Sequence, residues 1–325
     1  MRFVRWLCGL ALLSALLVSA GCTIEHFVAP ATAAAPAPLP RASRLILVSG
    51  ATGNQGGAVV RALLERGYKV RALTRHPEAL KAQKLAALGV EVIQGDLNDP
   101  SSLAPAVAGA YGVFSVQDFW EHGREGEIRQ GKNLADAAQA AGVKHFVYTS
   151  VGGADRAVGV PHFESKWEIE KYLHTLPLSS TILRPVSFME NWEYSARESV
   201  AKAKISSPLS PTTHFQQIAL DDIGRLAAEA FDHPDQWIGK TVEIAGDDRT
   251  MAEVAAAFEK AAGTKIGYVQ EPWPDFEKSA GPEITAMYRW FESDGYQADV
   301  AGLRARYPFM TSFDAYLEQH RWGKR

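Results

Sequence analysis

The chain has 325 residues, of which 46% are hydrophobic, and its formal net charge is −3. This composition suits a globular core of one or two domains, and the mild charge argues against nucleic acid as a partner, because phosphate backbones usually need a basic face. Both cysteines, Cys8 and Cys22, lie near the N-terminus, so the rest of the chain has no disulfide, no thiolate nucleophile and no cysteine-based metal site. The nine histidines follow no metal-binding spacing, and we expect no metal.

Residues 1–21 have the pattern of an export signal. Arg2 and Arg5 precede an apolar run that is too short for a comfortable membrane span. Cys22 follows small residues and resembles the lipidated cysteine of a bacterial lipobox. We therefore expect a lipoprotein of the bacterial cell envelope that contacts the membrane only through this leader or a lipidated Cys22. Simple secretion or an uncleaved anchor is a second interpretation, and a misassigned start, which would leave the protein in the cytoplasm, is a third.

Residues 22–43 are rich in alanine and proline and are expected to form an extended tether outside the fold. After this tether, apolar runs of strand length alternate with helical patterns, and three predicted helices end at a glycine, where the chain can turn back to a sheet. The predicted strands are 45–48, 68–73, 90–93, 111–116, 145–148 and 181–183, and the predicted helices are 58–66, 77–88, 100–107, 128–141 and 162–174.

This alternation predicts an α/β fold with a doubly wound parallel Rossmann sheet. We place the Rossmann domain at residues 44–190 and a smaller α+β C-terminal domain at residues 191–325, in which about 212–246 is a candidate to rejoin the Rossmann sheet. In the second domain, Asp221 is expected to cap a helix, and Thr250 begins a capping box that opens another.

The most specific feature is the turn Gly50-Ala51-Thr52-Gly53-Asn54-Gln55-Gly56, which follows the first strand and opens the first helix. Glycines at this spacing allow a tight turn, close approach of the backbone to a pyrophosphate, and close packing of helix on strand. The helix N-terminus then offers N–H groups and a positive dipole end to the phosphates. We interpret the turn as a dinucleotide site, and a purely structural turn is the alternative.

The end of the second strand decides between NAD and NADP. A carboxylate there would hold the ribose 2′-hydroxyl of NAD, but the strand ends at Thr74 and Arg75, with no carboxylate until Glu78. An arginine suits a 2′-phosphate, which a carboxylate would repel. The sequence therefore favours NADP(H), and the alternative is that Arg75 is only a solvated charge.

Several motifs together resemble the NmrA-like family of atypical short-chain dehydrogenases, over about residues 44–325. They are the glycine turn, Thr74-Arg75, Gln94-Gly95-Asp96-Leu97, Phe146-Val147-Tyr148-Thr149-Ser150, His162-Phe163-Glu164-Ser165-Lys166 and Pro185-Val186-Ser187-Phe188-Met189-Glu190-Asn191. The resemblance implies an NAD(P)-binding Rossmann domain with NADP(H) in a cleft beside a smaller domain.

The resemblance also assigns cofactor contacts to residues of this chain. It implies contacts at Gly50, Thr52, Gly53, Asn54, Gln55, Gly56 and Arg75, with Asp96 and Leu97 near the adenine, Gln117 and Asp118 at the end of the fourth strand, Lys166 near the nicotinamide ribose, and Ser187, Phe188, Met189 and Glu190 beside the nicotinamide. The family contains reductases, some of which act on quinones, and catalytically silent regulators that read the NADPH/NADP ratio.

The predicted catalytic group is His162, Lys166 and Ser150. Ordinary short-chain dehydrogenases use Tyr-x-x-x-Lys, and here His162 stands at the tyrosine position, four residues before Lys166 and on the same helical face. A helix N-terminus and a nearby ammonium both disfavour imidazolium, so we expect a neutral imidazole, which is a poor proton donor to an alkoxide. His162 either orients the acceptor or merely packs over the cofactor. Ser150 either polarises the acceptor oxygen or bonds to its local turn.

Aromatic and methionine side chains can line an apolar pocket over the nicotinamide or simply pack in the core. The candidates are Phe119, Trp120, Phe163, Phe188, Met189, Trp192, Trp273, Met287, Tyr288, Trp290 and Phe291, among which Phe119, Phe188 and Trp192 are favoured because they follow strand ends. The first hypothesis is an NADPH-dependent oxidoreductase acting on a quinone-like, apolar conjugated acceptor. The second is a silent redox sensor that regulates a protein partner, and the third is an envelope protein without cofactor.

Overall fold

The structure is a computed structural model that describes residues 40–322. These residues belong to one compact unit. The Rossmann domain and the C-terminal domain expected from the sequence are therefore two parts of a single folded body. Residues 1–39, with the predicted leader and Cys22, lie outside the described residues, and the lipoprotein interpretation stays a prediction. Within the described range, no helix combines the length and the apolar character that crossing a membrane requires.

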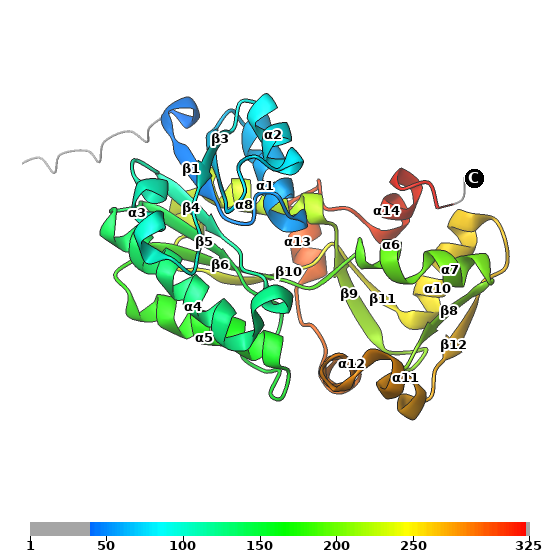
Figure 1. Cartoon of the computed structure of the whole chain (residues 1–325). Helices are drawn as coiled ribbons and strands as arrows, with labels where there is room; N and C mark the ends of the chain where they lie inside the picture. Colours follow the sequence, from blue (N-terminus) through cyan, green and yellow to red (C-terminus); the bar gives the residue numbers. More distant parts are fainter. Residues whose placement is uncertain (1–39, 323–325) are drawn as a thin grey trace, which may run out of the picture. The chain divides into compact units, whose positions relative to one another are not determined.

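A seven-stranded sheet, parallel throughout, forms the first part (Figure 1). In spatial order its strands are β3 (Glu91–Gln94), β2 (Lys69–Thr74), β1 (Leu45–Val48), β4 (Gly112–Ser115), β5 (His145–Thr149), β6 (Ser180–Pro185) and β10 (Thr241–Ile244). The order reverses between β1 and β4, and ligands bind such sheets at the carboxyl ends of the strands beside this point. The doubly wound parallel sheet predicted from the sequence is confirmed.

Helices cover both faces of this sheet. One face carries α1 (Asn54–Glu65), α2 (Leu80–Ala87) and α8 (Leu220–Asp232), and the other carries α3 (Pro100–Val107), α4 (Phe119–Ala140) and α5 (Pro161–Thr175). Side chains of β1 alternate between the two cores: Ile46 and Val48 share a cluster with Phe231 of α8, whereas Leu47 shares the other with Leu134 of α4. Because both faces are buried, β1 is apolar along its whole length.

The C-terminal part is built on two small sheets. β7 (Ser187–Phe188), β9 (His214–Ile218) and β11 (Asp247–Thr250) form the first, in the order β11-β9-β7, and β8 (Lys204–Ser207) pairs with β12 (Gly267–Gln270) in the second. The helices around them are α6 (Asn191–Ser195), α7 (Arg197–Ala201), α10 (Met251–Ala262), α11 (Trp273–Ala280), α12 (Pro282–Ser293) and α14 (Phe313–Gln319). Three short helices, η1 (Arg41–Ser43), α9 (Pro234–Trp237) and α13 (Val300–Arg306), complete the described chain. Of the range 212–246, α8 and β10 belong to the Rossmann part, whereas β9 belongs to the three-stranded sheet of the C-terminal part.

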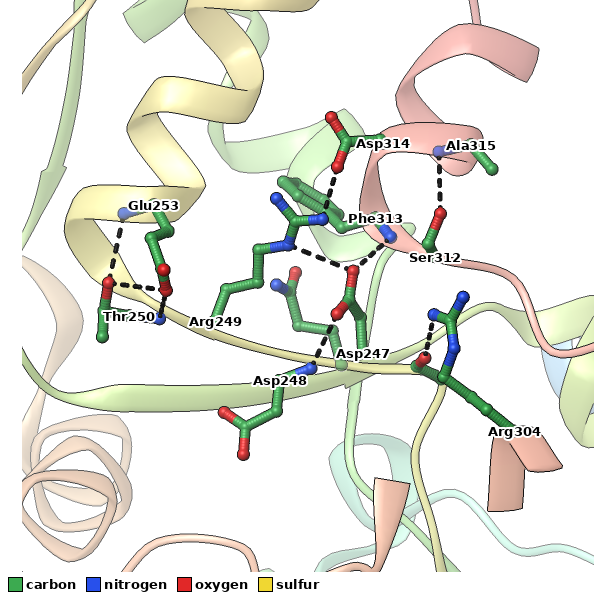
Figure 2. A network of polar contacts seen from close by, with 12 residues as sticks. Asp247, Asp248, Arg249, Thr250, Glu253, Arg304, Ser312, Phe313, Asp314 and Ala315 are labelled. Carbon is green, nitrogen blue, oxygen red and sulfur yellow. Dashed lines mark hydrogen bonds and ion pairs between the residues drawn. The ribbon is translucent and has the colours of Figure 1, made fainter. Parts of the chain in front are cut away.

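Figure 2 shows how polar contacts tie β11 to helices α10 and α14. The carboxylate of Asp247 accepts hydrogen bonds from Arg249 Nε at 3.1 Å and from the backbone N–H of Phe313 at 2.7 Å, at the start of α14. Thr250 and Glu253 form the capping box predicted at the start of α10. One strand therefore fixes the first turns of two helices that pack against each other.

Helix α4 begins earlier than predicted and is interrupted after one turn. It begins at Phe119 because the carboxylate of Asp118 accepts hydrogen bonds from the backbone N–H groups of Trp120 and Glu121. Gly123 then breaks the helix with φ 65° and ψ −179°, a conformation essentially restricted to glycine. The first turn of α4 is thus set apart from the rest of the helix.

Three other helices also begin at unpredicted residues. α1 begins at Asn54, inside the glycine turn, and α2 begins only at Leu80, after a short turn. The predicted cap Asp221 is wrong, because α8 begins at Leu220 and Asp221 lies within its first turn. The carboxylate of Glu190 caps α8 instead, because it accepts a hydrogen bond of 3.0 Å from the backbone N–H of Leu220, the first residue of the helix.

Candidate functional site

The carboxyl ends of the parallel strands open into a cavity of about 920 Å³. The cavity extends from the glycine turn after β1 to helix α12, so both parts of the fold contribute to its wall. The predicted site residues in this wall are Gly50, Thr52, Gly53, Asn54, Gln55, Gly56, Arg75, Asp96, Leu97, Gln117, Asp118, Phe119, Ser150, His162, Lys166, Ser187, Phe188 and Trp192. Folding therefore gathers side chains that are far apart in the sequence around one space.

At one end of the cavity, the glycine turn leads directly into α1. Gly50 has a φ of 58°, and a Cβ on Gly56 would overlap the backbone of Gly50 and Ala51. Gly53 caps α1 without a side-chain hydrogen bond, which leaves the first N–H groups of the helix available. This arrangement fits the pyrophosphate of a dinucleotide, which needs a close backbone and unpaired N–H donors.

Arg75 lies beside this phosphate end and is held by an acidic residue that the sequence did not reveal. Its guanidinium forms a bidentate pair with Glu121, with N···O distances of 2.6 and 3.1 Å. The hydrogen bond raises the pKa of Arg75 and lowers the pKa of the Glu121 carboxyl. Glu121 lies 46 residues after Arg75, so the residues next to the second strand give no sign of this pair.

His162 lies at the other end of the cavity, in the first turn of α5. Its Nδ1 is 2.8 Å from Glu283 Oε1, and its Nε2 is 3.3 Å from the sulfur of Met287, both on α12. The rings of Trp120 and Phe163 lie 5.0 and 4.9 Å from the imidazole, centroid to centroid. His162 is therefore oriented by a carboxylate and enclosed by apolar side chains.

This environment keeps the imidazole of His162 neutral. Burial lowers its pKa below the ordinary value, and the hydrogen bond to Glu283 only partly offsets that effect. The neighbouring Lys166 lowers the pKa further, as expected from the sequence, but burial is the larger cause. A neutral imidazole that donates its Nδ1 hydrogen to a carboxylate carries a lone pair on Nε2. In this state the Nε2 atom can accept a hydrogen bond but not donate one.

The sequence left open whether Ser150 polarises the acceptor or bonds to its local turn, and the structure pairs its hydroxyl with a buried carboxylate instead. The Ser150 hydroxyl donates to Oε1 of Glu170, a fully buried carboxylate on α5. Arg184 binds the same carboxylate through Nε at 3.0 Å and a second nitrogen at 2.8 Å, and a carboxylate in such an ion pair accepts hydrogen bonds but donates none. Because serine has a single O–H, Ser150 can offer only lone pairs to the cavity.

Lys166 is paired with a second buried carboxylate. Its ammonium contacts Glu127 of α4, whose side chain is fully buried, and Ser165 also donates to this carboxylate. Removing one member of such a pair typically leaves an uncompensated buried charge. An ammonium has three N–H donors, so Lys166 can hold Glu127 and still donate to a ribose hydroxyl.

Two residues predicted beside the nicotinamide, Met189 and Glu190, do not line the cavity. Met189 is fully buried in a cluster with Val254 of α10 and Phe313 of α14. Glu190 instead caps α8. β7 ends at Phe188, and Met189 and Glu190 form a turn before Asn191 and Trp192, which line the cavity again.

Comparison with known proteins now identifies the family. The model of the NmrA-like family matches residues 42–317. This chain belongs to the NmrA-like family. The NmrA-like family domain-containing oxidoreductase FrzB of Cladobotryum sp is 29% identical over 321 residues, which cover 85% of this chain and 94% of FrzB. The resemblance inferred from the motifs is confirmed.

Two solved structures share the fold over almost their whole length. The Citrobacter sp. triphenylmethane reductase complexed with NADP(H) has a TM-score of 0.73 and 25% sequence identity, and the match covers 84% of this chain and 99% of the reductase. The NADPH-dependent quinone oxidoreductase QOR2 of Escherichia coli, complexed with NADPH, has a TM-score of 0.72 and 26% identity, covering 85% and 99%. The cofactor in both agrees with the NADP(H) predicted here.

In this NmrA-like chain, the residues that sequence reasoning missed are mainly carboxylates. Glu121, Glu283, Glu127 and Glu170 each engage one of the predicted polar residues. Glu170 lies one helical turn after Lys166 on α5, a spacing that can be read from the sequence, although its partner is Ser150. Of the apolar candidates, Phe119, Trp120, Phe163, Phe188, Trp192, Met287, Tyr288 and Phe291 line the cavity, whereas Met189, Trp273 and Trp290 do not.

Proposed function

We propose that this NmrA-like protein is an NADP(H)-dependent oxidoreductase that reduces an apolar, conjugated acceptor. The glycine turn, the start of α1 and Arg75 would hold the phosphates, and Lys166 would hold the nicotinamide ribose. When bound, the nicotinamide supplies a hydride. The aromatic wall near His162 would take the acceptor, because aromatic and methionine side chains suit a flat, poorly solvated molecule.

The observation that carries the choice of acceptor is the state of the two expected proton donors. Ser150 gives its only O–H to Glu170, and His162 gives its N–H to Glu283. Reduction of a simple ketone needs a proton at the developing alkoxide, and neither group can supply it directly. A conjugated cation becomes neutral on gaining a hydride alone, and a quinone gives a delocalised anion that takes its proton from water.

The structural neighbours support this class of acceptor. One is a triphenylmethane reductase complexed with NADP(H), and the other is a quinone oxidoreductase complexed with NADPH. Triphenylmethane dyes and quinones are flat or propeller-shaped conjugated molecules that need little proton chemistry from the enzyme. The activities of these two neighbours therefore agree with an acceptor that needs no proton donor from the protein.

The proposal is tested by following NADPH oxidation by the full chain with three acceptors: a cationic triarylmethane dye, a benzoquinone and cyclohexanone. We expect turnover of the dye or the quinone. Turnover of the ketone should be at least about 100-fold slower, because the site has no acid catalyst for the developing alkoxide. Tight NADPH binding without reduction of any acceptor would overturn the proposal.

A second function, a catalytically silent redox sensor that regulates a protein partner, is favoured by the same lack of a free proton donor. A sensor must distinguish NADPH from NADP, so their affinities for the full chain should differ by at least about tenfold. Equal affinities, or steady turnover of the dye or quinone, would exclude it.

A further inference from the structure

The first turn of α4 connects the two ends of the cavity. We call Asp118–Gly123 the flap. Glu121 of the flap binds Arg75 at the phosphate end, whereas Trp120 of the same turn packs its ring 5.0 Å from the imidazole of His162 at the other end. A single helical turn therefore contacts both the predicted 2′-phosphate site and the predicted acceptor site.

We propose that Glu121 competes with the cofactor 2′-phosphate for Arg75, and that its displacement moves the flap away from His162. The inference rests on the proposed NADP(H) function and deepens it. It makes Glu121 a specificity-determining residue and makes the flap a gate that responds to NADP(H) but not to NAD(H).

The charges around Arg75 support the competition. A 2′-phosphate carries up to two negative charges and three acceptor oxygens, so it is a stronger ligand for a guanidinium than a carboxylate is. The Glu121–Arg75 pair is itself weak, because the two side chains are 47% and 43% exposed. Asp96 and Asp118 also act on Arg75 electrostatically. A phosphate at this site would therefore repel the Glu121 carboxylate, and movement of Glu121 away from Arg75 would relieve that repulsion.

The flap is built to move as one piece. Asp118 caps its N–H groups at one end, and Gly123 interrupts the helix at the other with a backbone conformation that places no side chain in the bend. Phe119 and Trp120 contact each other edge to face at 5.3 Å, so they would move together. Trp120 is 64% exposed, and its displacement costs little buried surface.

The chemical consequence concerns access to the nicotinamide end of the cavity. Trp120 and Phe119 both face the imidazole of His162, at 5.0 and 5.6 Å between centroids. Moving these rings enlarges the space in which an acceptor would lie. An NAD(H) molecule has no 2′-phosphate and would leave Glu121 on Arg75, so the flap would stay over His162.

The first test measures cofactor affinity by calorimetry on full-length Glu121→Gln. We expect NADPH to bind about tenfold more tightly than to the wild type, because the competing charge is gone, and NADH to change by less than about twofold. Glu125→Gln is the matched control: it removes the same charge from the same helix, but its partner is Arg124. Equal effects of the two substitutions on NADPH, or a parallel gain for NADH, would overturn the proposal.

The second test follows the flap through Trp120 emission, taken as the difference between the wild type and Trp120→Phe. We expect adenosine 2′,5′-bisphosphate to change this emission and adenosine 5′-monophosphate to leave it unchanged, although neither carries a nicotinamide. If the full chain binds neither NADPH nor the bisphosphate, the proposed function fails together with this inference. If it binds both while the Trp120 emission does not respond, only this inference fails.

Discussion

The two ends of the cavity are constructed in different ways. At the phosphate end, the binding groups are backbone N–H groups of the glycine turn and α1 and the guanidinium of Arg75, and they come from the consecutive elements β1, α1 and β2. At the acceptor end, each predicted polar side chain is held by a carboxylate from a different element of the fold, as His162 of α5 is by Glu283 of α12. The first end is a local property of the sequence, whereas the second exists only after tertiary packing. Substitutions at the two ends should therefore differ in which cofactor or reaction they affect.

The largest effect is expected at the phosphate end, for Gly56→Ala. A Cβ at this position would overlap the backbone of Gly50 and Ala51, so the turn must open and its N–H groups must shift. NADPH affinity, measured by calorimetry, should fall more than about 100-fold. Gly57→Ala is the control, since a Cβ there would make an ordinary 3.6 Å contact with the Ala51 carbonyl oxygen. Normal binding by Gly56→Ala would contradict the account of this turn.

The next largest effect is expected for Arg75→Asp. This substitution replaces the predicted 2′-phosphate ligand by a carboxylate beside Glu121, so NADPH should bind about 100-fold more weakly. NADH lacks this phosphate, and its affinity should change by less than about threefold. The ratio of the two dissociation constants is the measurement, and equal losses for both cofactors would remove the basis for NADP(H) selectivity.

Far less of the acceptor end than of the fold was predictable from the sequence. The apolar run of β1, the glycine turn and Arg75 each carry their signal within a few neighbouring residues, and the sheet and the phosphate site follow from them. The positions of His162, Lys166 and Ser150 and the neutral state of His162 were also predictable, but not the carboxylates that bind the three side chains. Their partners are set by how helices α4, α5 and α12 pack, which residue spacing does not encode.

A smaller effect is expected at the acceptor end, for His162→Phe. The phenyl ring can keep the packing against Trp120 and Phe163, and the neutral imidazole transfers no proton in the proposed reaction. Turnover of a triarylmethane dye should therefore fall less than about tenfold, below the range typical for loss of a general acid. A loss of 1,000-fold, with NADPH affinity preserved, would show that His162 acts as a proton donor.

The smallest effect concerns stability, for Glu190→Gln. Burial raises the pKa of Glu190 to about 7, although the hydrogen bond from the Leu220 N–H lowers this pKa in part. A pKa that is higher in the folded state means that the folded protein binds more protons than the unfolded chain between pH 4.5 and 7. Stability should therefore fall across this window as the pH rises, by about 1 kcal/mol once partial exposure is allowed for.

In Glu190→Gln, this part of the pH dependence should disappear, because glutamine cannot ionise and can still accept the hydrogen bond through its amide oxygen. Urea unfolding of both proteins at pH 5 and pH 8 measures the difference. The same pH dependence in the variant and the wild type would show that Glu190 titrates normally.

Calorimetric titration of the full chain with NADPH and with NADH tests the central claim, that the cavity is a dinucleotide site selective for the 2′-phosphate. We expect one NADPH per chain and at least about tenfold weaker binding of NADH, because only NADPH can displace Glu121 and engage Arg75. Absence of heat with both cofactors, or equal affinity for both, would contradict the account.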